Sequence, residues 1–291
     1  MSSLAPAAGV DAGAGHGDGL LDLRFRLAPG GRTVLTRRRQ RFPLRITVPL
    51  ELDPGLPGMP FVYVQNPTGG VFAGDRLTTR IDAGPGTRVH LTTPAATRVH
   101  RMDGGSAEQL TELEIGESAY VESIPEPIVP QAGSRLRSRV AVTLAANASF
   151  VGAELVTPGR VARGEVFDYG LVELETSITD ATGRRLCTDR IVLEPGRRAP
   201  AARGLLAGPS YLCTVVALAP GHDTEALAAA VDERLSERVG TAAAAGTLPH
   251  GAGIVARGLA PSLPVALVVL DTVWSYARRQ LLGAPPPPRR K

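Results

Sequence analysis

Apolar and polar residues alternate in short segments along much of the chain. Residues 21–27 place Leu21, Leu23 and Phe25 between charged residues, and residues 135–144 repeat this alternation with arginines on the polar side. Because successive side chains of a strand point to opposite faces, a period of two predicts half-buried strands. Further strands are expected at residues 42–50, 61–65, 76–81, 87–93, 97–101, 109–115, 119–123, 149–156, 171–179, 186–193 and 211–219.

The connections between these segments are rich in turn-forming residues. Residues 82–86 and 103–105 combine aspartate with glycine, which favours tight turns between strands. Many short strands separated in this way predict a mainly β fold, either as stacked antiparallel sheets or as a β-helix-like (solenoid) arrangement. Thr-Arg-Val-His occurs at residues 87–90 and again at 97–100. A repeat array requires about three or more units, so two copies do not indicate one.

Helical periodicity appears only late in the chain. Residues 224–239 place leucine and valine at four-residue steps, after Asp223 and before Gly240. Residues 263–282 carry a longer apolar stripe that includes Trp274. Such stripes, flanked by capping residues and a terminal glycine, are typical of helices. The sequence therefore predicts a small C-terminal helical part, which either covers a sheet or offers an apolar stripe to a partner.

Both ends of the chain differ in composition from the rest. Residues 1–19 are alanine, glycine, serine and aspartate with almost no large apolar side chain, which predicts a disordered tail. Residues 284–291 contain four consecutive prolines and two arginines, which predicts an extended tail. Residues 20–283, between the tails, are expected to form one β-rich domain.

Almost all of the positive charge is arginine, since the single lysine is Lys291. A Walker A loop and Schiff-base catalysis both need a lysine in the folded part, so these chemistries are excluded. The arginine runs at residues 37–41 and 135–139 belong to a chain with 28 acids and only 4% aromatic residues. No nucleic-acid partner is therefore expected, and the runs are interpreted as solvated strand faces or protein-docking surface.

Cys187 and Cys213 stand in apolar, strand-like segments, at no metal-binding or redox spacing. The longest apolar run, residues 265–270, is too short to cross a bilayer. The N-terminus shows no basic region followed by an apolar run, so no secretory signal is expected. The sequence therefore predicts a cytoplasmic protein without a membrane segment or a disulfide framework.

Signatures of the common enzyme classes are absent from the sequence, which has no Gly-x-Ser-x-Gly and no His-Glu-x-x-His motif. No catalytic residue and no stably bound cofactor is therefore predicted. A carboxylate pair such as Glu122 and Glu126 leaves a β-rich carbohydrate-active enzyme as an alternative. One tryptophan and five tyrosines offer few surfaces for sugars. A generic protein-interaction module is a further alternative.

The glycine-rich segment at residues 66–77 is the most distinctive part of the sequence. Gly69, Gly70 and Gly74 permit tight turns, and Asp75 follows directly. An aspartate in a turn commonly accepts hydrogen bonds from nearby backbone N–H groups. The functional alternative is a carboxylate that is presented to a ligand or partner.

Together with Thr-Thr-Pro-Ala-Ala-Thr-Arg-Val-His-Arg at residues 92–101, this segment resembles the urease accessory protein UreD (UreH) family. Members show a Pro-Gly-Gly-x-x-Gly-Gly-Asp-x-Leu segment and then a Thr-Thr-Pro-x-Ala-Thr-Lys-x-Tyr-Arg segment. The resemblance covers residues 32–283 and includes later matches at Ser123-Ile-Pro-Glu-Pro127, Gly159-Arg160, Gly164-Glu165, Asp189-Arg190 and Trp274. The chain departs from the family pattern at Ala73, His100, Glu126 and Ala153.

The resemblance implies a mostly β scaffold that helps to deliver nickel to apo-urease. Such a scaffold binds UreF, which recruits the nickel-loaded GTPase UreG, and the assembly docks on the urease structural subunits. A channel through the protein is the proposed nickel route in this family. Four carboxylates at or beside matched motifs are therefore the candidates for transient nickel contact: Asp75, Glu154, Glu165 and Asp189.

Structural roles are the alternatives for several of these side chains. Asp75 and Asp189 each precede an arginine, so an ion pair with that arginine is as plausible as contact with nickel. His90 and His100 could also contact the metal, since nickel favours imidazole and carboxylate ligands. Each of these histidines shares a strand face with an arginine, which disfavours a cation there, and a structural role is the more common one.

Overall fold

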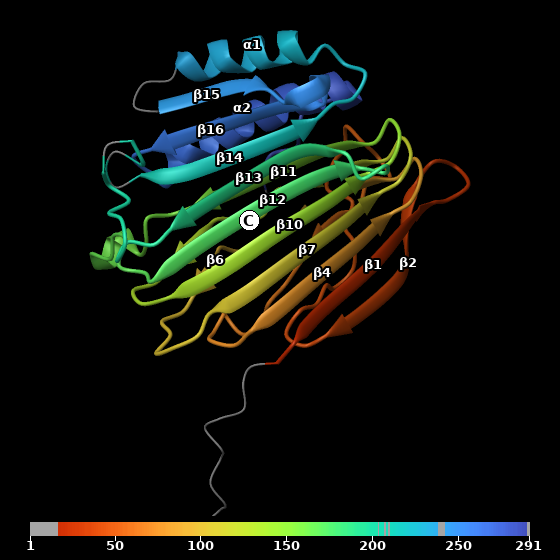
Figure 1. The fold of residues 1–291 in the computed structure, drawn as a ribbon. Coiled ribbons are helices and arrows are strands. Elements are labelled where there is room, and N and C mark those ends of the chain that lie inside the picture. Colours follow the sequence, from red (N-terminus) through yellow and green to blue (C-terminus); the bar gives the residue numbers. More distant parts are fainter. Residues whose placement is uncertain (1–16, 203, 207, 209, 238–241, 290–291) are drawn as a thin grey trace, which may run out of the picture.

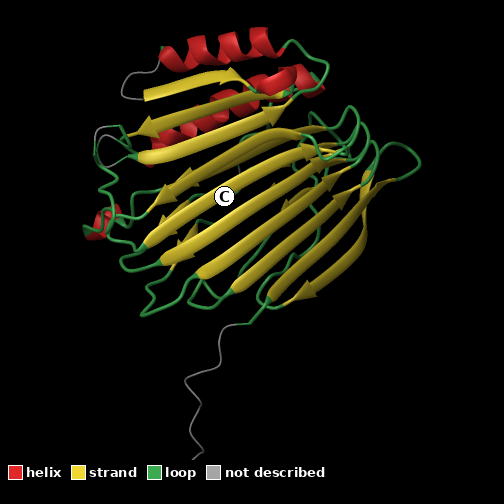
Figure 2. Cartoon of the chain, viewed as in Figure 1, coloured by secondary structure: helices red, strands yellow, loops and turns green. Residues whose placement is uncertain are grey.

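The computed structural model describes residues 17–202, 204–206, 208, 210–237 and 242–289. This part of the chain consists mainly of strands, which form two stacked sheets, with two α-helices packed against one of them (Figure 1; Figure 2). The mainly β fold with a small C-terminal helical part is therefore confirmed.

The first sheet is seven-stranded in the described residues and has the order β13-β12-β10-β7-β4-β1-β2. In chain order its strands are β1 (Gly19–Leu27), β2 (Thr33–Arg41), β4 (Arg76–Ala83), β7 (Ala107–Ile115), β10 (Arg135–Leu144), β12 (Leu171–Asp180) and β13 (Arg185–Leu193). The inner neighbours pair in parallel, and only the edge strands β2 and β13 pair antiparallel.

The second sheet has nine strands in the described residues, with β15-β16-β14-β11-β8-β5-β3 as its main path. β6 and β9 pair with each other beside β11. Its strands are β3 (Phe61–Tyr63), β5 (Arg88–Thr92), β6 (Thr97–Val99), β8 (Tyr120–Ser123), β9 (Ile128–Pro130), β11 (Ser149–Val156), β14 (Tyr211–Leu218), β15 (Ala242–Thr247) and β16 (Gly253–Ala260).

The chain winds between the two sheets as a parallel coil. β4 leads into β5, β7 into β8 and β10 into β11, so that each turn of the coil passes through both sheets. These turns begin at residues 76, 107 and 135. The solenoid-like alternative is therefore correct. The ten-residue offset between the Thr-Arg-Val-His copies is not the repeat, because β5 and β6 carry both copies within one turn of the coil.

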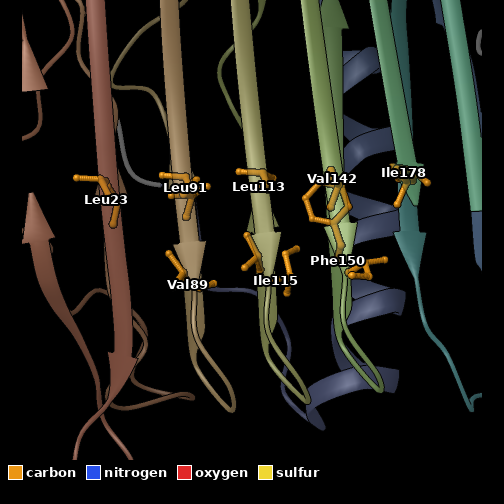
Figure 3. Close-up of a cluster of buried hydrophobic side chains, with 14 of the residues drawn as sticks. Leu23, Val89, Leu91, Leu113, Ile115, Val142, Phe150 and Ile178 are labelled. Carbon is orange, nitrogen blue, oxygen red and sulfur yellow. The ribbon is translucent and has the colours of Figure 1, made fainter. Parts of the chain in front are cut away.

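Aligned apolar side chains fill one half of the coil. Parallel register places Leu113 beside Val142, and Val142 beside Ile178, in one row across the first sheet. Figure 3 shows this row, with Val89 and Phe150 of the second sheet packed beside it. All five side chains are almost fully buried, which makes this row the centre of the larger apolar core.

The outer face of the seven-stranded sheet is covered by ion pairs. Arg137 Nε lies 3.2 Å from Glu173 Oε2, and Arg139 Nε lies 3.4 Å from Glu175 Oε1, in both cases across β10 and β12. The arginine run at residues 135–139 therefore forms a solvated strand face. Exposed pairs of this kind contribute little stability each, about 0–1 kcal/mol.

The helices α1 (Thr224–Ser236) and α2 (Leu263–Leu282) cover the outer face of the nine-stranded sheet. α1 packs on β15 and β16, and α2 packs on β14, β16 and β11. The structure confirms the helix at 263–282 and most of the one at 224–239, whose last residues lie outside the described part. Covering a sheet is thus the role of both apolar stripes. Neither helix in the described chain is long and apolar enough to span a bilayer.

Several sequence predictions of strands were wrong. The segment 42–50 is not a strand but an irregular connection with isolated bridges at Arg45 and Leu50. Pro43 and Pro49 have no N–H to donate, which prevents a continuous ladder there. β2, β9, β15 and β16 were not predicted. The arginine run hides the alternation in β2, and the alanines of β15 carry little strand preference.

The two predicted tails fall partly outside the described chain. Residues 1–16 lie outside it, and β1 begins at Gly19, within the predicted tail. At the other end the structure describes residues 284–289, which have no helix or strand. Arg289 Nε lies 3.2 Å from Asp271 Oδ1 of α2, so this segment returns to the helix that precedes it.

Candidate functional site

A cavity of about 170 Å³ lies between the two sheets. Its walls come from β4, β7, β10, β12 and β13 on one side and from β5, β11, β14 and β16 on the other. Much of the lining is apolar, and polar side chains gather in two places. The first group is Glu154, Thr176, Cys187, Asp189 and Thr214. The second group is Thr92, Thr93, Ser123 and Glu126.

The cavity exists because small polar residues occupy inward positions of the coil. Thr79 lies beside Thr111 in register, and Thr176 lies beside Asp189 in the same row of the first sheet. In the next row, Leu113 and its neighbours are large and closely packed. The row that contains Thr79, Thr111 and Thr176 has smaller side chains, which cannot fill the same distance between the two sheets. Space for water or an ion therefore remains there.

Glu154 of β11 and Asp189 of β13 approach the cavity from opposite sheets. The Thr176 hydroxyl donates to Glu154 Oε2 over 3.2 Å, and the Arg257 guanidinium donates to Asp189 Oδ2 over 2.5 Å. Arg257 also donates to the Thr214 hydroxyl. Asp189 is therefore compensated by an arginine, whereas Glu154 has no ion pair among the described residues.

The environment of the cavity changes the protonation of its side chains. Burial raises the pKa of Glu154 to about 7, with a smaller contribution from the negative charge of Asp189, while the bond from Thr176 opposes the shift. Burial likewise raises the pKa of the Cys187 thiol. Near neutral pH the Glu154 carboxyl therefore alternates between its charged and neutral forms, and Cys187 carries its proton.

Asp75 does not line this cavity. It is buried in the loop before β4, where its Oδ2 accepts a hydrogen bond of 2.9 Å from the Phe72 N–H. The predicted role in capping a backbone turn is therefore correct. The predicted ion pair with the next residue is wrong, because Arg76 instead approaches Glu108, with 3.9 Å between Nε and Oε2.

Glu165 also lies outside the cavity. Arg160 forms a bidentate ion pair with its carboxylate, and the Ala132 N–H donates to Oε2 over 3.1 Å. The hydrogen bonds from Arg160 lower the pKa of Glu165. Of the four predicted carboxylates, the structure thus brings only Glu154 and Asp189 together.

The ion pair predicted between Asp189 and the following arginine is also absent. Successive side chains of β13 point to opposite faces, so Asp189 faces the cavity while Arg190 points outward. Arg190 Nη2 lies 2.6 Å from Glu173 Oε1 on the outer face of the sheet. The partner of Asp189 is Arg257, which follows 68 residues later and could not be paired from the local sequence.

The glycine-rich segment packs tightly on β6 and on His100, which follows β6. The His100 ring stacks on Phe72, with centroids 4.4 Å apart and planes 3° from parallel. This contact explains how histidine replaces the aromatic residue usual in the family. A Cβ on Gly70 would lie 2.5 Å from both Arg98 O and His100 Nε2, so only glycine fits there. His100 is thus a packing residue and does not line the cavity.

Glu122 is the centre of a second, fully buried polar cluster. Its carboxylate accepts hydrogen bonds from Tyr120 (2.7 Å), Trp274 (2.6 Å) and Arg278 (2.8 Å), and it contacts His90 Nδ1 at 2.8 Å. Arg278 also forms an ion pair with the buried Asp53. Burial lowers the pKa of Arg278 to about 10. Sequence reasoning missed this cluster, since its members come from four separate segments.

The cluster excludes the carbohydrate-active pair suggested by the sequence. Glu122 has no exposed surface, and its carboxylate is occupied by protein groups, of which Trp274 and Arg278 hold α2 against the sheet. Glu126 is only partly buried and lines the inter-sheet cavity. The two carboxylates therefore do not face a common substrate.

His90 belongs to the same buried cluster. Its ring stacks on Phe61, with centroids 4.1 Å apart, and lies 5.7 Å from the Trp274 ring. A small cavity beside these rings is lined in part by Pro287, Pro288 and Arg289. Since Thr92 and Glu126 line both cavities, the C-terminal segment lies next to one end of the larger one.

The donor set of the inter-sheet cavity suits brief contact with a divalent metal ion. Three carboxylates, those of Glu126, Glu154 and Asp189, are available together with a thiol and threonine hydroxyls, and nickel accepts such ligands. Nowhere in the described chain do three or more His, Cys, Asp or Glu side chains form a metal-binding group.

Comparison with known proteins gives a consistent result. A family model described as UreD urease accessory protein matches residues 17–291. The chain is 37% identical over 276 residues to urease accessory protein UreD 2 of Streptomyces griseus, covering 94% of this chain and 93% of that protein. It is 36% identical over 277 residues to urease accessory protein UreD of Haloarcula marismortui, covering 94% and 90%. The counterpart from Mycolicibacterium gilvum is 34% identical over 252 residues, covering 87% and 90%.

Proposed function

The chain belongs to the UreD family of urease accessory proteins, and from that premise we propose that it is a scaffold through which nickel reaches apo-urease. The scaffold binds UreF, which recruits the nickel-loaded GTPase UreG, and the assembly docks on the urease structural subunits in the cytoplasm. The chain itself performs no catalysis and keeps no cofactor. Nickel is its cargo.

The observation that carries this proposal is the inter-sheet cavity with Glu154 and Asp189 on facing walls. A route for a divalent ion needs oxygen ligands inside an otherwise apolar protein, because an ion without ligands is too costly to bury. The route must also release the ion, so it cannot surround the ion completely with strong ligands. The cavity meets both requirements.

The two carboxylates differ in a way that suits transfer. Arg257 compensates Asp189, which weakens the attraction of this carboxylate for a cation. Glu154, with its pKa raised to about 7 by burial, gives up a proton when a cation approaches and takes one back when the cation leaves. In this mechanism a proton takes the place of the departing nickel ion on Glu154, which lowers the cost of leaving this buried side chain without a cation.

Deletion of the gene from a urease-producing host tests the proposed function. We expect urease subunits to accumulate in folded form but with little nickel and little activity. Reintroduction of the wild-type chain restores both. Urease of full activity and full nickel content in the deletion strain would refute the proposal.

A further inference from the structure

Most of the exposed large apolar side chains of the described chain lie in or next to β2 and the connection that follows it. In the described chain, five of the seven such residues lie between positions 27 and 50. Phe42 is 70% exposed and Val48 is 62% exposed, in the connection that follows β2. Apolar side chains that cluster in this way commonly mark a site of protein association.

The same segment carries a concentrated positive charge. Residues 32–50 contain six arginines and no acidic residue, which exceeds the net charge of +4 of the whole chain. Arg37 is paired with Asp22 over 2.6 Å, whereas Arg39 and Arg45 form no ion pair with any described residue. We call residues 34–50 the arginine edge. Its unpaired guanidinium groups favour an acidic partner.

β2 within the arginine edge also has an open side. It is the last strand of its sheet and pairs with β1 alone among the described strands. The Thr33 N–H bonds to Gly58 O, but from Val34 to Arg41 the described backbone makes hydrogen bonds only within the β1–β2 pair. An open edge of this length can accept a further strand through backbone hydrogen bonds.

From these three features together we propose that the arginine edge binds an extended, acidic segment of a partner protein, which adds as a strand beside β2. Backbone pairing supplies the alignment, carboxylates of the segment bind the free arginines, and its apolar residues cover Phe42 and Val48. Within residues 34–50 the inter-sheet cavity is lined only by the buried Leu44, which the proposed contacts do not use, and the proposal does not depend on the movement of nickel.

Other occupants fit these features less well. A second copy of this chain would place arginine against arginine, because charged residues on an edge oppose pairing between identical strands. Residues 1–16 contain a single acid, Asp11, and cannot balance the charge. Nucleic acid and anionic lipid would use the arginines but leave the strand edge unpaired, and Phe42 is the one aromatic residue in the segment.

The test uses the full-length protein and a fluorescent peptide of alternating glutamate and valine. Arg39→Glu with Arg45→Glu is the test variant. Arg185→Glu with Arg198→Glu is the matched control, since both control arginines are exposed, without an ion pair among the described residues, and Arg185 lies on the opposite edge strand of the same sheet. Thermal unfolding confirms that both variants fold. Peptide binding is measured by fluorescence anisotropy, and amide hydrogen exchange locates it.

We expect the test variant to weaken peptide binding by about tenfold or more and the control to leave it nearly unchanged. Peptide N-methylated at alternate residues should lose binding, and unmodified peptide should slow exchange in β2. Equal weakening by both variants, or full binding of the methylated peptide, would overturn the proposal. So would tighter binding of duplex DNA or phosphatidylserine vesicles at the arginine edge, or peptide binding that requires deletion of residues 1–16.

Discussion

The indole N–H of Trp274 donates a 2.6 Å hydrogen bond to the Glu122 carboxylate, at a point where neither side chain reaches solvent. This bond joins α2 to the middle of the nine-stranded sheet. Arg278 donates to the same carboxylate one helical turn later. The position of α2 is therefore specified by directional polar contacts as well as by apolar packing.

Replacement of Glu122 by alanine should strongly destabilise the fold. The change leaves Arg278, Trp274 and Tyr120 buried without their acceptor, and breaking a buried pair from one side costs about 3–5 kcal/mol. Urea unfolding followed by circular dichroism measures the loss. Glu117→Ala, at an exposed carboxylate, is the control and should stay within about 0.5 kcal/mol of wild type. A similar loss in both variants would show that the cluster does not hold α2 in place.

The stability of the protein should decline with rising pH because of Glu154. Its pKa is raised from 4.5 in the reference state to about 7 in the folded state, so the folded protein binds the extra proton between these values. Stability therefore falls as the pH rises through this window. Glu154→Gln removes the effect, and the variant should gain roughly 2 kcal/mol relative to wild type between about pH 5 and about pH 8. Unfolding free energies that differ by a constant amount across this range would contradict the shift.

Removal of residues 285–291 should expose the ring of Trp274. Pro287 and Pro288 line the small cavity beside this ring, and Trp274 is the single tryptophan of the chain. We expect red-shifted emission and stronger quenching by acrylamide in the truncated protein, with little change in circular dichroism. Arg289→Gln, which breaks only the ion pair with Asp271, should produce a smaller change of the same kind. Identical quenching in truncated and full-length protein would contradict this arrangement.

Gly70→Ala should destabilise the glycine-rich segment. The added methyl group would lie 2.5 Å from the backbone oxygen of Arg98, and relief of such a contact costs about 1–3 kcal/mol. Gly104→Ala is the matched control, since a Cβ there meets no atom within 4 Å. Thermal melts compare the two. Equal melting temperatures would mean that the segment adapts to a side chain at position 70.

Much of the fold could be predicted from alternation and turn residues. β10 and α2 begin and end at the predicted residues, because regular periodicity and clear boundaries both mark them. The parallel coil could not be derived in this way, since a period of two predicts a strand but not its neighbours. The signal for the cavity was present in the inward threonines Thr79 and Thr111, but it acquires meaning only once the register is known.

The candidate site was predictable only in part. Glu154 and Asp189 were selected by resemblance to the family, and the structure places them on the same cavity. Asp75 and Glu165 were selected in the same way, yet both lie outside the cavity, where Asp75 accepts a hydrogen bond from Phe72 and Glu165 pairs with Arg160. A sequence motif identifies a residue without showing whether its role is structural or functional. The contacts that the residue makes in the folded protein decide between these two roles.

The nickel content of urease produced together with variants of this chain tests the central claim most directly. Glu154→Gln with Asp189→Asn removes the charges of the two facing carboxylates while nearly keeping side-chain volume, and Glu165→Gln is the control outside the cavity. We predict that the double variant folds and yields intact urease whose nickel content is lowered about tenfold or more. The control should load urease normally. Wild-type nickel content with the folded double variant would contradict passage of nickel through this cavity.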